Sequence, residues 1–392
     1  MNLIEDLLER YESGNLKQPK FKLENLDNKP IILFGAGGLG KDICRILKNQ
    51  GKNVLCFLDT VHCTEADMKK KIVIQEYQMS IYHPENSELK EFLESSYIIL
   101  SALFSLDVQE KIKEQLSLIG FKNVYALTEV NFKSINSESL YELLHISNDY
   151  SRLLKNEKLR IIDAFNLLKT DQDKDLYIEH IQAHITKNFS EKKEPFDVSL
   201  QYLAHDIPEV KDYRNFIDCG AYDGDTIKSF SEKGVSLENV VFFEPQNDLH
   251  EKIVKYVEQN NEKFNSALIF PCGVSFRTQK LRFSKSETVP SSSMIDEYGS
   301  EVIQCVAIDD VLHGFNPTFI KMDIEGAELD ALKGARNTIM NNRPQLAICV
   351  YHSLSHIWEI PLLINSYYEG YKFYLRCYNQ MGLETVLYAF PE

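Results

Sequence analysis

Two stretches of this chain each join an apolar run to a glycine-bearing turn and then to an amphipathic segment. The first is "ILFGAGGLGKD" near the N-terminus, and the second is "FIDCGAYDGDT" at residues 216–226. A strand, such a turn and a helix form the unit of an open α/β sheet, where ligands bind at the carboxyl ends of the strands. The two stretches therefore predict two α/β domains, each with a nucleotide-sized site.

The patterning around the two turns supports this division. Residues 1–133 alternate strand-like and helical segments, and residues 214–392 do so again, ending in two strand-like runs that predict an antiparallel hairpin. Residues 134–213 carry apolar positions at helical spacing. We expect an α/β chain with two Rossmann-like doubly wound domains, the first of nucleotide-binding type. A helical connector joins them and either packs on the second domain or acts as a spacer.

Charge and composition exclude several classes of function. The formal net charge of -15 disfavours nucleic acid or an anionic membrane surface as a partner, because both would be repelled. The sequence has no apolar run long enough to span a bilayer and no signal peptide at its start. Its eight cysteines are scattered, several of them inside apolar runs, which is typical of a reduced compartment. We expect a cytoplasmic protein.

The acidic character of the second turn indicates which class of ligand it binds. Gly220 and Gly224 allow a ligand to approach the backbone closely, and Asp218 can accept a hydrogen bond from a ligand amino group. Acidic side chains at 218, 223 and 225 suit a cation better than a diphosphate. S-adenosylmethionine carries a sulfonium and an ammonium and no phosphate. Glu244, which ends the next strand, stands where a carboxylate binds ribose hydroxyls, or it is an ordinary surface carboxylate.

Several segments of the C-terminal half resemble the FkbM family of S-adenosylmethionine-dependent methyltransferases. They are "FIDCGAYDGDT", "VVFFEPQ", "VAIDDVL", "FIKMDIEGAELDALKGA" and "ETVLYAFP". The chain departs from the family at Tyr222 and Asp223, where the family more often has Asn and a further Gly. The resemblance implies a class I methyltransferase fold over 214–392, O-methylation of sugars and related natural products, and a cofactor site formed by Asp218, Gly220, Ala221, Gly224, Asp225, Thr226, Glu244, Pro245 and Asp323.

Methyl transfer to a hydroxyl needs a base near the acceptor. Asp323, Glu325 and His352 follow strands that point at the ligand crevice. We expect Asp323 to lie nearest the acceptor and His352 to act as base or acceptor ligand, although His352 can also be a satisfied core histidine. For Glu325, and more so for Glu328, the simpler interpretation is a carboxylate that favours the start of a helix.

Two further patterns bear on the acceptor and on metals. His352 and His356, like His180 and His184, are four residues apart, but neither pair has an obvious third ligand, so we expect no metal. The loop around Ser292 and Ser293 offers hydroxyl groups that can cover an acceptor, or it is a solvated loop.

The first turn fits the pattern G-x-G-x-x-G through Gly35, Gly37 and Gly40, and Asp59 ends the next strand. This segment resembles the N-terminal domains of bacterial sugar-modifying enzymes, in some of which the domain holds the nucleotide part of the substrate. We consider three roles: a nucleotide or nucleotide-sugar site, a nicotinamide site, and a scaffold or dimerisation domain.

The sequence thus predicts an S-adenosylmethionine-dependent O-methyltransferase that modifies a sugar or nucleotide-linked sugar. Its partner is a small-molecule or glycan acceptor, and self-association into a homo-oligomer stays open. Two alternatives use the first turn: an NAD(P)-dependent oxidoreductase and a nucleotide-sensing binding protein.

Overall fold

The computed structural model describes residues 3–16, 21–22, 26–74, 76–102, 106–131, 150–189, 195–285, 294–295 and 298–392. The chain forms two compact units, each built from separate segments. Unit 1 comprises residues 1–153, 178–195 and 379–383, and unit 2 comprises 154–177, 196–378 and 384–392. Residues of the predicted connector 134–213 therefore fall in both units.

Unit 1 contains a six-stranded sheet in the order β4-β5-β3-β2-β6-β7. Its strands are parallel except for β4, which is antiparallel to β5 at the edge. Strand β2 lies between β3 and β6, so the strand order reverses beside β2, which is where open α/β sheets generally bind ligands. The strands are β2 Ile31–Phe34, β3 Val54–Leu58, β4 Lys69–Ile74, β5 Tyr77–Tyr82, β6 Tyr97–Leu100 and β7 Asn123–Ala126.

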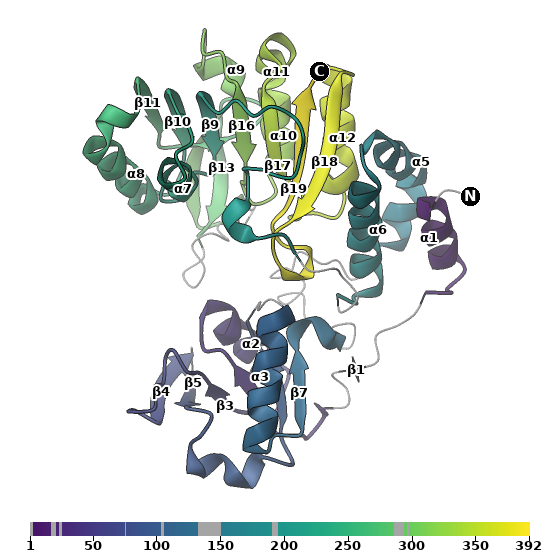
Figure 1. Cartoon of the computed structure of the whole chain (residues 1–392), viewed down its shortest axis with the longest axis vertical. Helices are drawn as coiled ribbons and strands as arrows, with labels where there is room; N and C mark the ends of the chain where they lie inside the picture. Colours follow the sequence, from purple (N-terminus) through teal and green to yellow (C-terminus); the bar gives the residue numbers. More distant parts are fainter. Residues whose placement is uncertain are drawn as a thin grey trace. The chain divides into compact units, whose positions relative to one another are not determined.

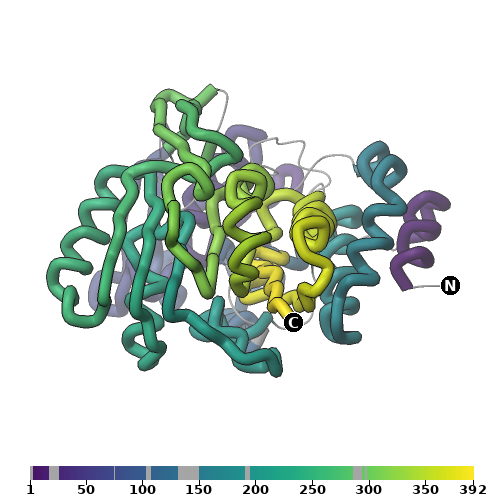
Figure 2. Tube along the Cα trace, turned by 90° about the horizontal axis from the view of Figure 1, so that it is seen from above, coloured from purple at the N-terminus to yellow at the C-terminus, as the bar shows by residue number. Residues whose placement is uncertain are grey.

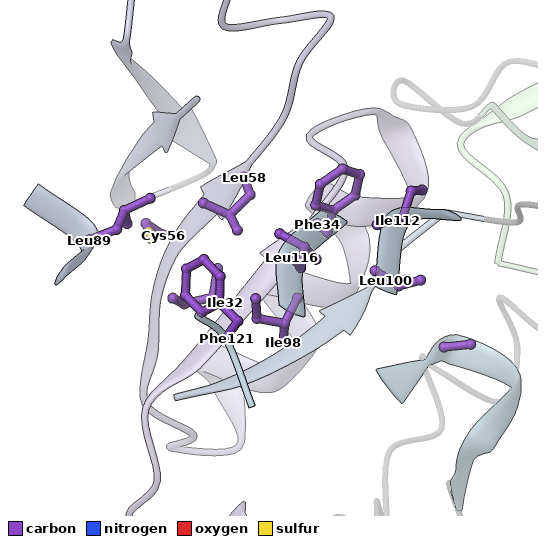
Figure 3. Packing of buried hydrophobic residues seen from close by; sticks show 11 residues of the cluster. Ile32, Phe34, Cys56, Leu58, Leu89, Ile98, Leu100, Ile112, Leu116 and Phe121 are labelled. Carbon is purple, nitrogen blue, oxygen red and sulfur yellow. The ribbon is translucent and has the colours of Figure 1, made fainter. Parts of the chain in front are cut away.

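Apolar side chains from the strands and from helix α3 form the core of this sheet (Figure 3). All four residues of β2 are buried, as expected for a central parallel strand covered on both faces. The cluster comprises Ile32, Phe34, Cys56, Leu58, Leu89, Ile98, Leu100, Ile112, Leu116, Phe121 and Ala126. The remaining elements of unit 1 are α1 Leu3–Glu12, β1 Phe21–Lys22, α2 Gly38–Asn49, η2 Ser87–Phe92, α3 Leu106–Ile119, η3 Leu127–Glu129, β8 Val130–Asn131 and η8 Gln380–Gly382.

Unit 2 contains a seven-stranded sheet in the order β11-β10-β9-β16-β17-β19-β18 (Figure 1). The first five strands are parallel, and β19 is antiparallel to both β17 and β18. The predicted α/β class and the closing hairpin are both confirmed. The strands are β9 Asn215–Cys219, β10 Asn239–Phe243, β11 Ser266–Phe270, β16 Phe319–Met322, β17 Gln345–Cys349, β18 Tyr371–Cys377 and β19 Thr385–Pro391.

Helices cover this sheet, and α10, α11 and α12 contact one another side by side (Figure 2). Pro361 lies inside α12, whose sequence is otherwise strongly apolar. The helices are α7 Asp225–Glu232, α8 Asn247–Gln259, α9 Ile308–Val311, α10 Glu328–Gly334, α11 Arg336–Asn342 and α12 His356–Tyr367, with the short turns η5 Val198–Leu200 and η6 Asn261–Lys263.

A second, four-stranded sheet in the order β12-β15-β13-β14 was not predicted. Its strand β15 lies within the alternating pattern of residues 214–392, but it pairs with β13 and β12 instead of joining the main sheet. The strands are β12 Gly273–Val274, β13 Gln279–Ser284, β14 Met294–Ile295 and β15 Glu301–Val306.

Helices α5 Ser151–Leu167 and α6 Asp171–Thr186 begin in the region predicted as helical. Within unit 2, Asp173 is fully buried and accepts hydrogen bonds from Arg376 Nη1 at 2.6 Å and from the Leu375 backbone N–H at 3.0 Å. Lys169 N–H donates to the Phe373 carbonyl. The segment where α5 gives way to α6 is thus attached to strand β18.

Candidate active site

The second glycine turn lies where β9 and β16 run side by side and the strand order reverses. Gly220 has φ +77°, and a Cβ at this position would lie 1.8 Å from the Asp323 carbonyl oxygen. Asp323 N–H in turn donates to the Cys219 carbonyl at 3.0 Å. The ends of the two strands are therefore in close backbone contact, and only glycine fits at position 220.

Asp218 and Lys321 form an ion pair beneath this turn. Both side chains are almost completely buried, with Lys321 Nζ 3.0 Å from Asp218 Oδ1. Lys321 also donates to the Gly220 carbonyl at 2.7 Å. Burial raises the pKa of Asp218 to about 6, and Lys321 opposes that rise. This enclosed carboxylate holds the turn through Lys321, and the predicted contact of Asp218 with the cofactor stays a prediction.

The start of α7 also differs from the acidic turn that the sequence suggests. Asp223 pairs with Lys228 at 3.0 Å, so its charge is balanced by a lysine. Gly224 caps α7 with φ +87°, and Asp225 occupies the first turn of the helix. Of the other predicted cofactor residues, Ala221 and Thr226 are buried beside this turn and Pro245 is partly buried.

Glu244 lies directly after β10, where the sequence places it, and is 4% exposed. Its carboxylate accepts the Tyr222 N–H at 3.0 Å and the Gln246 N–H at 2.8 Å. Burial raises the pKa of Glu244 to about 7, although these two N–H donors lower it. Glu244 is therefore fixed against the glycine turn as a rigid acceptor and is not an ordinary surface carboxylate.

Asp323 stands at the end of β16 and contacts two tyrosines. Tyr202 donates its hydroxyl to Asp323 Oδ2 at 3.0 Å, and the Tyr351 hydroxyl lies 3.4 Å from Oδ1. His352 Nε2 is 3.5 Å from the same Oδ1. The sequence brings Asp323, Glu325 and His352 together as candidates, and the structure places all three in one cluster.

His352 is held between carboxylates on both ring nitrogens. Nδ1 is 2.9 Å from Glu328 Oε1, and Nε2 is 3.4 Å from Glu325 Oε2. Burial lowers the pKa of His352, but Glu328 and Glu325 outweigh it and raise the pKa well above its usual value. Carboxylates at both ring nitrogens fix the orientation of the imidazole, and the role of His352 as base or acceptor ligand stays a prediction.

The structure corrects our interpretation of Glu328. The sequence favoured a carboxylate that only assists the start of a helix. Glu328 is the first residue of α10, but its side chain is fully buried. Oε1 accepts the Ile324 N–H at 3.0 Å and the Gly326 N–H at 3.4 Å, while Oε2 lies 3.3 Å from His356 Nδ1. Burial raises its pKa, but His352 and His356 hold the value well below the usual range. Glu328 organises the loop that carries Asp323 and Glu325.

Sequence reasoning missed three members of the site. Tyr202 comes from the segment predicted as connector, and Tyr351 immediately precedes His352. Glu384, just before β19, accepts from Gln201 Nε2 at 2.8 Å and lies 3.5 Å from the Tyr351 hydroxyl. Burial and the charge of Asp323 raise the pKa of Glu384 to about 7. A polar residue immediately before a fully buried strand was the only available signal for Glu384.

Two groups of side chains in the described part of the chain have the composition of metal sites. In Asp323, Glu325 and His352, one ligand atom from each residue lies within 4.8 Å of the others, and Asp323, Cys349 and Glu384 form a similar group. The spacing His352/His356 does not create a shared site, because both Nδ1 atoms face Glu328. Ser292 and Ser293 lie outside the described residues.

The first turn, in unit 1, is held together by its own residues. A Cβ at Gly40 would lie 2.0 Å from the Gly35 carbonyl oxygen, whereas one at Gly37 would meet no atom within 4 Å. Asp59 Oδ2 accepts the Ala36 N–H at 2.7 Å, and its Oδ1 accepts two N–H groups of its own loop. Burial opposes these bonds, but they lower the pKa of Asp59. Asp59 therefore braces the glycine turn, and binding of a ribose there stays a prediction.

Comparison with known proteins identifies the C-terminal segment. Residues 218–374 match the model of the methyltransferase FkbM domain. This segment is therefore similar to the methyltransferase FkbM domain. The match spans β9 through most of β18 and thus includes Glu244, Asp323 and His352. Tyr202 and Glu384 lie outside it and are supplied by flanking segments of unit 2.

The fold also resembles a solved structure, the methyltransferase FkbM from Methylobacillus flagellatus KT. The TM-score is 0.70 at 18% sequence identity, over 99% of each chain. At this identity the likeness concerns the fold, and it extends beyond the FkbM domain to unit 1. No curated protein matches this sequence. None of the helices described here has the length and apolar character needed to cross a bilayer.

Proposed function

We propose that the FkbM domain transfers the methyl group of S-adenosylmethionine to a hydroxyl of a sugar or nucleotide-linked sugar. The observation that carries this proposal is the close contact of Gly220 with Asp323. It sets the glycine turn with Glu244 beside the cluster of Asp323, Glu325 and His352. A cofactor site and a proton-accepting site thereby adjoin at the carboxyl edge of one sheet.

The cofactor side suits a nucleoside without phosphate. Glu244 offers a fixed carboxylate to two ribose hydroxyls, and Gly220 and Gly224 leave the backbone open to close approach. Asp225, in the first turn of α7, would repel a phosphate at this helix terminus. S-adenosylmethionine supplies an electrophilic methyl group on its sulfonium when bound here.

The acceptor side suits a polyol. Asp323, Glu325 and Glu384 provide hydrogen-bond acceptors for sugar hydroxyls, and the hydroxyls of Tyr202 and Tyr351 fix Asp323. During transfer, a bond forms between the acceptor oxygen and the methyl carbon as the carbon–sulfur bond breaks. The acceptor proton passes to the carboxylate pair Asp323 and Glu384, and S-adenosylhomocysteine is released.

Calorimetric titration of the full chain with S-adenosylhomocysteine tests the cofactor side without knowledge of the acceptor. We expect saturable binding at about one per chain, weakened at least tenfold by Glu244→Ala and unchanged by Glu251→Ala, an exposed carboxylate on α8. Absence of binding by the folded protein would refute the assignment. With binding established, transfer of a labelled methyl group to free sugars and to nucleotide sugars tests the acceptor class.

The alternatives that use the first turn rest on unit 1. Asp59 and Glu244 both brace their turns by accepting backbone N–H groups, but it is the second turn that lies beside the cluster of Asp323, Glu325 and His352. We therefore favour the methyltransferase over the oxidoreductase and over a purely nucleotide-sensing protein. Gly35, Gly37, Gly40 and Asp59 stay a candidate nucleotide site, for which the open space at Gly37 is the supporting feature.

A further inference from the structure

We propose that Asp323, Glu325 and His352 bind a divalent cation that chelates two neighbouring hydroxyls of the acceptor. The identity of the acceptor rests on the proposed function, but the cation site rests on this chain's own side chains. These three residues follow two adjacent strands, β16 and β17, at the edge where the ligand crevice lies. One ligand atom from each residue lies within 4.8 Å of the others, and His352 Nε2 is near both Asp323 Oδ1 and Glu325 Oε2.

The spacing of these atoms fits the coordination sphere of an ion. His352 Nε2 lies 3.5 Å from Asp323 Oδ1 and 3.4 Å from Glu325 Oε2. Adjacent ligands of an octahedral ion stand about 2.8 to 3.7 Å apart for bond lengths between those of Mg²⁺ and Ca²⁺. An N–H···O hydrogen bond is shorter, at about 2.7 to 3.2 Å, and one Nε2 proton cannot point at both carboxylates. The gap therefore suits a cation better than a direct contact.

Outer contacts hold each ligand in place, as metal sites require. Glu328 Oε1 binds His352 Nδ1 at 2.9 Å and thereby directs Nε2 toward Asp323 and Glu325. The same oxygen accepts the Ile324 N–H, which fixes the loop between the two carboxylates. Tyr202 holds Asp323 through Oδ2, and the Tyr351 hydroxyl lies 3.4 Å from Oδ1, on the side of the cluster. At metal sites, a histidine that ligates the ion commonly donates its other ring N–H to a carboxylate.

The charge of the cluster also favours a bound cation. Asp323, Glu325, Glu328 and Glu384 bring four carboxyl groups together. Lys321, the neighbouring cation on β16, is directed to Asp218 and the Gly220 carbonyl. Two carboxylates with one imidazole suit Mg²⁺ or Mn²⁺ in preference to the softer ions that thiolate ligands select.

A cation at this point would explain how a weakly acidic sugar hydroxyl becomes a nucleophile. Two vicinal hydroxyls and a water molecule would complete its octahedral coordination, and ligation lowers the pKa of a bound oxygen acid. The proton then passes to Glu384, the member of the carboxylate pair that is outside the ligand set. The methyl group is transferred to the ionised oxygen as proposed above. The substrate class is thereby narrowed to sugars with two adjacent free hydroxyls.

The test is Mn²⁺ binding to the full chain after treatment with a chelator, followed by electron paramagnetic resonance or calorimetry. We expect about one Mn²⁺ per chain, with the affinity reduced at least tenfold by Glu325→Gln. The matched control is Asp330→Asn, which changes an exposed carboxylate on neighbouring α10 that pairs with Lys333, and should leave the affinity unchanged. Glu325→Gln is a mild change because this side chain is not fully enclosed.

Two results would overturn the proposal. If the folded wild-type chain binds no Mn²⁺, His352 itself neutralises the cluster as an imidazolium. If binding persists in Glu325→Gln and in His352→Gln, the ion lies elsewhere. S-adenosylhomocysteine titration of the same samples separates this proposal from the methyltransferase assignment. Mn²⁺ binding without S-adenosylhomocysteine binding would preserve the cation site and refute the cofactor site, and the reverse result would do the opposite.

Discussion

Lys321 and Asp218 are register partners on the adjacent strands β16 and β9, and their side chains meet as a buried ion pair. The pair is joined to the Gly220 carbonyl, so it connects the interior of the sheet to the glycine turn. Loss of either partner would leave a charge in a space with little access to water.

We therefore predict that Lys321→Met destabilises unit 2 by about 3 to 5 kcal/mol, the usual cost of breaking a buried pair from one side. The double variant Lys321→Met/Asp218→Asn should recover much of that loss. Trp358, the single tryptophan of the chain, is fully buried in α12 and makes fluorescence during urea unfolding a direct measure of this unit. Equal losses in the single and double variants would contradict the prediction.

Asp323→Asn tests the acceptor side. The amide keeps the shape of the side chain but removes one charge of the carboxylate pair Asp323 and Glu384, so turnover should fall by about 10² to 10⁴. The dissociation constant of S-adenosylhomocysteine should change less than twofold, because Glu244 and the glycine turn are untouched. Asp330→Asn, with normal turnover, is the control. Unchanged turnover in Asp323→Asn would remove this residue from the mechanism.

The pKa of Glu244, raised to about 7 by burial, predicts a pH-dependent affinity for the cofactor product. Below pH 7 the free protein carries a protonated Glu244, which has fewer acceptor sites for ribose hydroxyls. The affinity for S-adenosylhomocysteine should therefore rise by up to about tenfold per pH unit toward pH 7 and level off above it. Glu244→Gln should bind more weakly and flatten this dependence; a slope that persists in this variant would assign it to another group.

Glu244 makes the stability of the fold change with pH in the opposite direction to the affinity. Because the folded-state pKa of Glu244 lies above the usual value of 4.5, the folded protein binds a proton more tightly than the unfolded chain does. Glu244 therefore opposes folding increasingly as the pH rises from about 4.5 to 7. Glu244→Gln should accordingly be relatively more stable at pH 8 than at pH 4, as measured by urea unfolding.

Substitutions at two glycines of the first turn distinguish a role in packing from a role in ligand binding. Gly40→Ala should strongly destabilise unit 1, since its Cβ would overlap the Gly35 carbonyl oxygen. Gly37→Ala meets no neighbour and has an ordinary φ of −70°, so the fold should be kept. If a nucleotide or nucleotide sugar binds this turn, Gly37→Ala should weaken that binding in calorimetry. Unchanged affinity for every nucleotide bound would favour a scaffold role for unit 1.

Local patterns were sufficient to predict the strand–turn–helix units and the closing hairpin. In β9 and β16 the buried runs lead directly into the turns that carry Gly220 and Asp323, so sequence order already specifies their place. The small sheet was not predictable in this way. Strand β15 alternates exposed and buried residues, and its partner β13 is chosen by packing that a single segment does not encode.

The direction of the side chains was the main feature of the site that the sequence did not predict. Glu328 has the position of a residue that favours a helix start, and only the fold turns its carboxylate inward to two histidines. Tyr202 lies more than a hundred residues before its partner Asp323. Glu384 lies beyond the end of the matched domain. Contacts of this kind depend on tertiary structure, so a motif confined to one stretch could not reveal them.

The distribution of the two units along the sequence has a practical consequence. The six segments alternate between the units, so the polypeptide passes from one to the other five times. No single cut can release the catalytic part intact: a fragment that starts at residue 214 would lack Tyr202 and the Asp173 anchor of β18. A gene fusion or split at the apparent domain boundary would therefore remove part of the candidate active site.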